Sequence, residues 1–184
     1  MIRPTYLLMI LGIAALLVLP LAQLLPGALA GSAGKHHEEE HEDHDSHVSE
    51  GRGFRVVHAW TRATNAKTAL VFMEIENEDD HELVLEGAET SIAAKAGLVA
   101  FRLSGGKETY PPLERLPVAP SSHLELEPRG AAIRLEGLKR KLKKGQEFEL
   151  VLGLGREGEH FHLTVQVQVE AADAKRHSHA GHQH

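Results

Sequence analysis

Short runs that alternate apolar and polar residues dominate the chain between positions 54 and 169. In VFMEIEN, residues 71–77, the side chains of Val71, Met73 and Ile75 share one face and glutamates take the other. A period of two is the pattern of a strand with one buried face. Similar runs are FRVVHAW, HELVLEG, HLELEP, AIRLEG, EFELVLG and FHLTVQVQV. The pattern therefore predicts a series of short strands.

Turn-forming residues separate these runs at 77–80, 104–107, 128–130 and 155–158. Only SIAAKAGLVA, residues 91–100, has a composition compatible with a helix, and it is short. Many short strands at close spacing, without long helices between them, predict an all-β fold. The two architectures that fit are an antiparallel β-sandwich and a closed antiparallel sheet.

The last run carries two histidines on its polar face. Phe161 and Leu163 begin the apolar face, while His160 and His162 lie on the opposite one. Imidazoles two residues apart on a strand project side by side and could hold one metal ion between them. Two ligands without a third make a weak site, so solvated rings are the alternative.

The first thirty residues have the features of a secretory leader. Arg3 gives a positive start, residues 6–25 are almost wholly apolar, and Ala28-Leu29-Ala30 offers the small residues that signal peptidase accepts. The apolar run also matches the roughly twenty residues that cross a bilayer, so a retained membrane anchor is the alternative. In both cases we expect the rest of the chain outside the cytoplasm, in a bacterial periplasm.

Composition narrows the classes of partner. A formal net charge of -6 and an aromatic content of 4% argue against nucleic acid. The absence of cysteine excludes disulfides, thiolate metal sites and lipid attachment to a cysteine. We expect a leader or anchor at 1–30, a disordered segment rich in histidine and acid at 31–53, one β-sandwich domain at 54–170 and a histidine-rich tail at 171–184.

Two polar tails hold nine of the 14 histidines. They are His36, His37, His41, His44 and His47 in the first tail and His177, His179, His182 and His184 in the second. The first tail mixes imidazoles with carboxylates and offers no apolar side chain to bury, so it cannot form a packed core. Imidazole and carboxylate suit Cu(II), Zn(II) and Ni(II), among which copper stands highest in the general affinity order. We predict that the tails bind a divalent ion, copper(II) first, with zinc or nickel as alternatives.

The alternatives to metal binding by the tails are a soluble spacer and, for the second tail, a purification sequence. The irregular spacing of RHSHAGHQH and the enrichment of histidine at both ends of the chain argue against them. The isolated histidines His58, His81 and His123 lie near expected strand ends or turns, where exposed or locally hydrogen-bonded rings are the usual case.

Three stretches resemble the PCu(A)C family of periplasmic copper chaperones. They are VVHAWTRAT, VFMEIENEDDHELVLEGAE and LELEPRGAAIRLEGLKRKLKKGQEFELVL, and together they span most of residues 56–169. The resemblance implies a cupredoxin-like β-sandwich in a periplasmic setting. It also implies where copper ligands would stand: a histidine, a methionine further along, and a histidine-x-methionine pair just before a Gly-Leu-Lys turn.

Counted back from that turn, the family's ligand positions fall near Val99, on Tyr110, and on Ala132 and Arg134. None of these residues can serve as such a ligand, and no methionine follows Met73. Monovalent copper prefers sulfur ligands, and Met73, on the strand face expected in the core, is expected to fill space rather than bind metal. The resemblance therefore implies the cupredoxin-like fold and the periplasmic setting, but not the family's copper site.

Two hypotheses for function follow. The first is a copper chaperone-like periplasmic protein that holds a divalent ion in its tails and buffers it or delivers it to a recipient protein. The second is a metal-independent extracytoplasmic interaction module that has lost the family's copper site. We do not expect an enzyme, because EHFH is not the helical HExxH arrangement and no serine stands in a glycine-flanked elbow.

Overall fold

A computed structural model describes residues 48–176 of the chain, and all regular structure in that range is strand. The strands are β1 (Val48–Gly51), β2 (Phe54–Arg62), β3 (Thr68–Asn77), β4 (Leu83–Glu89), β5 (Lys95–Ala100), β6 (Arg102–Ser104), β7 (Lys107–Thr109), β8 (Leu116–Val118), β9 (Ser122–Leu126), β10 (Ala131–Glu136), β11 (Glu147–Arg156) and β12 (Glu159–Glu170). Within this range no helix is long and apolar enough to cross a membrane.

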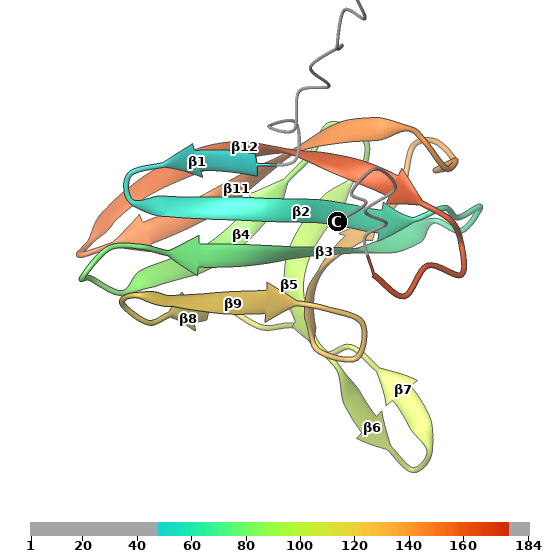
Figure 1. Ribbon diagram of the computed structural model, residues 1–184. Coiled ribbons are helices and arrows are strands. Elements are labelled where there is room, and N and C mark those ends of the chain that lie inside the picture. Colours follow the sequence, from blue (N-terminus) through green and yellow to red (C-terminus); the bar gives the residue numbers. More distant parts are fainter. Residues whose placement is uncertain (1–47, 177–184) are drawn as a thin grey trace, which may run out of the picture. The chain divides into compact units, whose positions relative to one another are not determined.

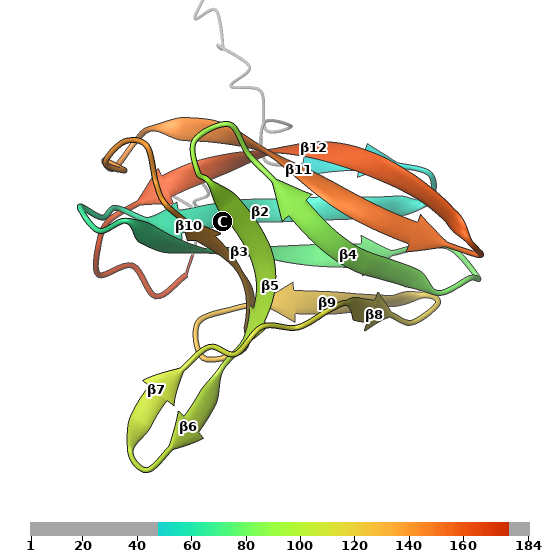
Figure 2. The same cartoon turned by 180° about the vertical axis from the view of Figure 1, so that it is seen from behind.

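The strands form one large sheet that folds over on itself, with β6 and β7 as a separate hairpin. The order along the sheet is β5-β10-β9-β3-β2-β12-β11-β4-β8, and β1 pairs with β2. Figure 1 shows β2, β3 and β9 in the nearer layer, and Figure 2 shows β4, β5 and β11 on the opposite side. The predicted all-β sandwich is confirmed, and most pairings are antiparallel. The β12–β2 and β10–β9 pairings are parallel.

The main core lies between the two layers and follows the predicted alternation. Val71, Met73 and Ile75 of β3 are at most 3% exposed, and all three pack into it. In β12 the apolar residues from Phe161 to Val167 face this core, while His160 and His162 are exposed. Met73 thus fills space in the interior, as expected.

A β-bulge in β2 reverses which face its side chains take. Val57 lies opposite Glu74 and Trp60 lies opposite Phe72, so β2 has one residue more than β3 between these pairs. His58, at φ 54°, lies within this bulge. Because the alternation shifts by one residue there, the Trp60 side chain lies on the outer face of the sheet.

On that outer face a second, small apolar cluster forms. Its buried members are Trp60, Phe72, Val99 and Ala132, and Leu70, Tyr110 and Ala174 pack against it. The rings of Trp60 and Phe72 lie 4.8 Å apart, centroid to centroid. The sheet between β2 and β5 is therefore covered by apolar side chains on both faces.

Two sequence expectations need correction. The stretch 91–100, considered as a helix, forms a turn followed by β5, whose Leu98 packs inward while Val99 packs outward. All six residues of β5 pair with β10. This pairing outweighs the helix preference of the alanine residues in the stretch. The ordered part also begins before residue 54, because β1 and its turn occupy residues 48–53 of the segment expected to be disordered.

Candidate metal centre

Most of the histidines predicted to bind metal lie outside the described residues. These are His36, His37, His41, His44 and His47 of the first tail and His177, His179, His182 and His184 of the second. Their role stays a prediction. Of the second tail, 171–184, the structure describes residues 171–176.

The predicted pair His160 and His162 lies on the exposed face of β12. The Nδ1 atom of His160 lies 2.7 Å from Oε2 of Glu86, which gives that ring a carboxylate partner on β4. Neither histidine belongs to a group of three ligating side chains among residues 48–176. A metal site at this pair remains untested.

The four positions at which the sequence resemblance places the family's copper ligands lie close together in space. Ala132 of β10 lies directly opposite Val99 of β5, and both belong to the outer cluster. Arg134, two residues further on the same face, donates from Nη1 to the backbone oxygen of Tyr110 at 2.9 Å. At these positions the domain has apolar side chains, a tyrosine and a guanidinium, none of which is a copper ligand.

Beside these positions the surface is hollowed by a pocket of about 460 Å³. Arg62, Tyr110 and Arg134 line it, and the Arg62 guanidinium lies 5.7 Å from the ring centroid of Phe72. Glu108 also lines the pocket and Arg134 pairs with Glu136 at 2.8 Å, but a guanidinium has no lone pair to offer a metal ion and these positions supply no imidazole or sulfur. This region is therefore unsuited to hold a metal ion with the side chains present.

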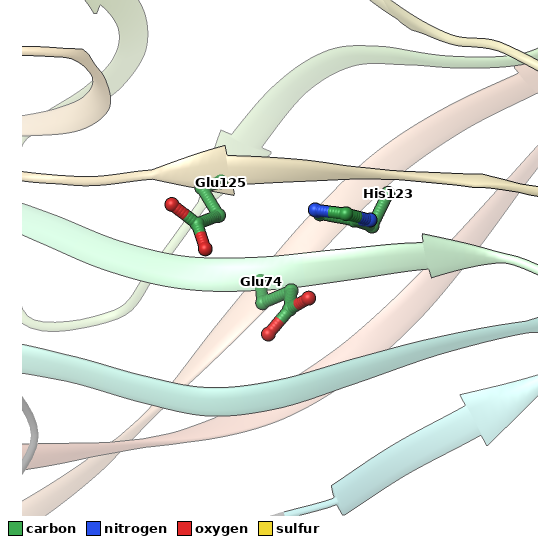
Figure 3. Close-up of side chains that lie close together, drawn as sticks. All are labelled: Glu74, His123 and Glu125. Atoms are coloured by element: carbon green, nitrogen blue, oxygen red, sulfur yellow. The ribbon is translucent and has the colours of Figure 1, made fainter.

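A different group of ligating side chains stands on the outer face of β3 and β9. Glu74 lies directly opposite Glu125, and His123 precedes Glu125 by two residues on β9. Figure 3 shows the three side chains gathered on one face of these two strands. One ligand atom from each lies within 4.8 Å of the other two. Glu74 is half-buried, and His123 and Glu125 are exposed.

We call this group the Glu74–His123–Glu125 cluster. Among residues 48–176 no hydrogen bond or ion pair occupies any of its three side chains. Like charges directly opposite each other on antiparallel strands are destabilising. A cation between the carboxylates of Glu74 and Glu125 would remove that cost. One nitrogen and two carboxylate ligands suit a borderline divalent ion such as Zn(II) or Cu(II).

A second group, Asp79, Asp80 and His81, lies in the turn after β3 but is already paired. The His81 ring hydrogen-bonds to Asp79, and this bond, together with the charges of Asp80 and Glu157, raises the pKa of His81. The pKa of Asp79 is lowered, first by the hydrogen bond with His81, and Arg156 Nη1 also lies 2.6 Å from its Oδ2. The His81 ring and the Asp79 carboxylate thus already have partners that would compete with a metal ion for the same atoms. We therefore interpret this group as a structural turn.

The Glu74–His123–Glu125 cluster was not predicted from the sequence. His123 was expected near a strand end as an isolated ring, and Glu74 was expected only on the polar face of its strand. The sequence feature that could have indicated the cluster was the pair of alternating runs VFMEIEN and HLELEP, which place these residues on polar strand faces. Their register, which brings Glu74 opposite Glu125, depends on a pairing between strands about fifty residues apart in the chain.

The described domain matches the model of a known protein family. The model of the family described as lipoprotein LpqE-like matches residues 54–169. No match was found among curated proteins. None of the 184 residues is a cysteine, so the lipid attachment implied by the family description has no cysteine to use here.

Solved structures of PCuAC domains share the fold. The chain resembles a copper-bound PCuAC domain from PmoF2, with 18% identity and a TM-score of 0.56, over 68% of this chain and 98% of that one. An apo PCuAC domain from PmoF1 gives 20% identity and a TM-score of 0.56, over 68% and 99%. The solution structure of CuI-DR1885 from Deinococcus radiodurans gives 27% identity and a TM-score of 0.51, over 64% and 78%. The cupredoxin-like fold implied by the sequence resemblance is thereby confirmed.

Proposed function

This chain belongs to the LpqE-like family and has the PCuAC fold, and we propose from these two premises that it binds a divalent metal ion outside the cytoplasm, to buffer it or deliver it. The copper-bound state of the PmoF2 domain and of DR1885 supports copper as the ion. The two histidine-rich tails supply the ligands. The observation that carries the proposal is this combination: a fold that holds copper in its relatives, and nine histidines in the tails that flank it.

The ligand chemistry favours the divalent state. Imidazole and carboxylate are ligands for Cu(II), Zn(II) and Ni(II), whereas Cu(I) prefers sulfur. In the folded domain the methionine that remains, Met73, is 3% exposed and packs in the core. Cu(II) is therefore our first choice, with zinc or nickel taken up where copper is scarce.

A second function is favoured by one observation. Val99 and Ala132, at positions where the family has ligands, are buried in an apolar cluster, so the domain has lost the chemistry of its relatives at that place. A metal-independent module that docks on an extracytoplasmic partner is consistent with this loss. We propose a non-catalytic role in both cases, since no positioned nucleophile was found in the sequence.

The setting we propose is the periplasm. The family description and the fold of its relatives support a location outside the cytoplasm. The apolar segment at residues 6–25 would serve as a cleaved leader or as the anchor. Mass determination of the mature N-terminus distinguishes the two, because cleavage after Ala30 removes the whole segment.

The test is elemental analysis of full-length protein purified without a metal-affinity column, followed by calorimetric titration with Cu(II) and Zn(II). A matched variant carries asparagine at the nine tail histidines, which keeps length and polarity and removes the nitrogen ligands. We expect wild type to bind ions at micromolar concentration or tighter and the variant to lose most of that capacity. Wild type that binds no divalent ion at micromolar levels would establish the metal-independent alternative.

A further inference from the structure

We infer that the pocket beside β2, β3 and β10 binds a small organic anion, with the carboxylate of the ligand on Arg62 and its apolar body on Leu70. Tyr110 and Arg134, two of the positions where the sequence resemblance places copper ligands, line the same pocket. The inference goes beyond the proposed metal binding, because it involves neither the histidine-rich tails nor a metal ion.

The pocket has the size of a small-molecule site and lies across three strands. Its volume of about 460 Å³ is within the range of about 300–1,000 Å³ that ligand pockets have. Arg62 follows directly on Thr61, which pairs with Val71 of β3. Arg134 of β10 pairs with Leu70 of β3 from the other side. The two arginines therefore flank Leu70, about 10 Å apart at the backbone.

The Arg62 guanidinium is held in one orientation. Its Nε donates to the backbone oxygen of Ala174 at 2.6 Å, and its central carbon lies 5.9 Å from the ring centroid of Trp60 and 5.7 Å from that of Phe72. None of the ion pairs within residues 48–176 includes Arg62, and Glu170, its backbone neighbour on β12, does not line the pocket. A guanidinium binds a carboxylate through two parallel hydrogen bonds, so the two terminal nitrogens of Arg62 suit this group.

The other two charges in the lining of the pocket already have partners. The carboxylate of Glu108 lies 2.7 Å from Nη2 of Arg129. The Nε of Arg134 lies 2.8 Å from Oε1 of Glu136. Among the described residues, Arg62 is therefore the charge in this lining that lacks an ion-pair partner. One positive charge that is not neutralised favours a ligand with one negative charge.

The rest of the lining favours an apolar body on the ligand. Ala63, Ala69 and Leu70 are half-buried and line the pocket with carbon. The hydroxyl of Thr61 donates to the backbone oxygen of Leu70 at 2.7 Å. Thr109 belongs to the β6–β7 hairpin, which Figure 1 shows projecting from the sheet, and its hydroxyl donates at 3.2 Å within that hairpin. Because these two hydroxyl hydrogens are already used, the wall beside Arg62 suits carbon groups better than polar ones.

The binding test uses full-length, metal-free protein and benzoate as the probe. Benzoate joins one carboxylate to a compact apolar ring. We expect saturable shifts of backbone amide NMR signals, largest at residues 61–64, 68–70 and 108–110, with a Kd on the order of 1 mM for so small a ligand. Benzyl alcohol has the ring without the charge, and inorganic phosphate has charge without the ring. Both are expected to bind about tenfold more weakly than benzoate, or more weakly still.

Four full-length variants test the residues. Arg62→Gln is expected to weaken benzoate binding by about tenfold to a hundredfold, because it removes hydrogen bonds to a charged group. Arg62→Lys keeps the charge without the planar fork and is expected to fall between Arg62→Gln and wild type. Arg115→Gln removes the same charge from an exposed arginine outside the pocket and is expected to leave the Kd unchanged. Glu108→Gln removes the carboxylate from the lining and is expected to tighten benzoate binding by about two- to fourfold, without changing the affinity for benzyl alcohol.

Several outcomes would overturn the inference. Benzoate shifts that do not saturate, or a wild-type Kd in Arg62→Gln, would show that Arg62 serves only to hold the backbone at Ala174. Equal affinity for benzyl alcohol would exclude a carboxylate site, and equal affinity for phosphate would exclude the apolar body. If Arg62→Gln does not fold, Arg62→Lys and Glu108→Gln decide, and unchanged benzoate affinity in both would refute the site. Calorimetric titration of wild type with Cu(II) is independent of all these results, so the proposed metal binding is tested separately.

Discussion

Restoring the family's ligands should restore a copper site in the sandwich. The change is Val99→His, Tyr110→Met, Ala132→His and Arg134→Met in one protein. Val99 and Ala132 lie opposite each other, and Arg134 contacts the backbone of Tyr110, so the four new side chains start close together. We expect this variant to bind Cu(I), which wild type lacks the sulfur ligands to hold at this place.

The stability that the metal-free variant loses can be worked out from the burial of the substituted residues. Val99 is 1% exposed and Ala132 is 0% exposed. Each buried imidazole without a partner costs about 1–3 kcal/mol, and overpacking adds about 1–3 kcal/mol. A total on the order of 5 kcal/mol lowers the melting temperature by about 15–20 °C in a domain of this size. Cu(I) at about a thousand times its Kd would return about 4 kcal/mol and most of that loss.

The assay is thermal unfolding with and without Cu(I) under reducing, anaerobic conditions, with Cu(I) competition against a chromophoric chelator. Wild type is the control, and its melting temperature should not respond to stoichiometric Cu(I). A variant that folds, shows the lowered melting temperature and still gains nothing from Cu(I) would refute the assignment of the four positions.

Three further predictions concern stability and pH. Gly137→Ala should destabilise by about 1–3 kcal/mol in chemical denaturation, because φ is +68° and a Cβ would lie 2.8 Å from that of Ala94. The control Gly145→Ala, at φ +80° with nothing within 4 Å, should lose less stability. Equal losses in the two variants would show that the contact with Ala94 does not contribute. The raised pKa of His81 stabilises the fold fully below about pH 6.5, its ordinary value, and this stability is lost as pH rises through the folded pKa. Melting temperatures of His81→Gln across that range should therefore depend less on pH than those of wild type, and parallel curves would contradict this. Tail metal affinity should be much weaker at about pH 5.5 than at about pH 7.5, since imidazole is protonated between them, and equal calorimetric affinities would disprove imidazole ligation.

The alternating pattern was sufficient to predict the larger strands. FRVVHAW, VFMEIEN and EFELVLG became parts of β2, β3 and β11, because a half-buried strand on a folded sheet leaves a period of two in the sequence. The short strands β1, β6, β7 and β8 were not predicted, and β5 was considered as a helix. Three or four residues are too few to show a period, and an alanine-rich stretch becomes a strand only when a neighbour pairs with it.

The candidate site was harder to predict than the fold. The family resemblance placed two ligand positions near Val99 and on Ala132, and the pairing of β5 with β10 brings these two residues opposite each other. The Glu74–His123–Glu125 cluster could not be anticipated, because it depends on the register between β3 and β9. A shift of one residue would turn His123 and Glu125 to the core face, and the sequence does not state that register.

The bulge at His58 has a consequence for comparing this chain with its relatives. One inserted residue decides whether the indole of Trp60 or the methyl group of Ala59 enters the interior. Deleting the extra residue would give a regular ladder with Ala59 still inward and Trp60 still outward, whereas keeping it without the bulge would exchange the two and empty the outer cluster of its largest ring. Gap placement at this point in an alignment therefore determines which residues are equated, and a shift by one position would match interior side chains with solvent-side ones for the rest of the strand.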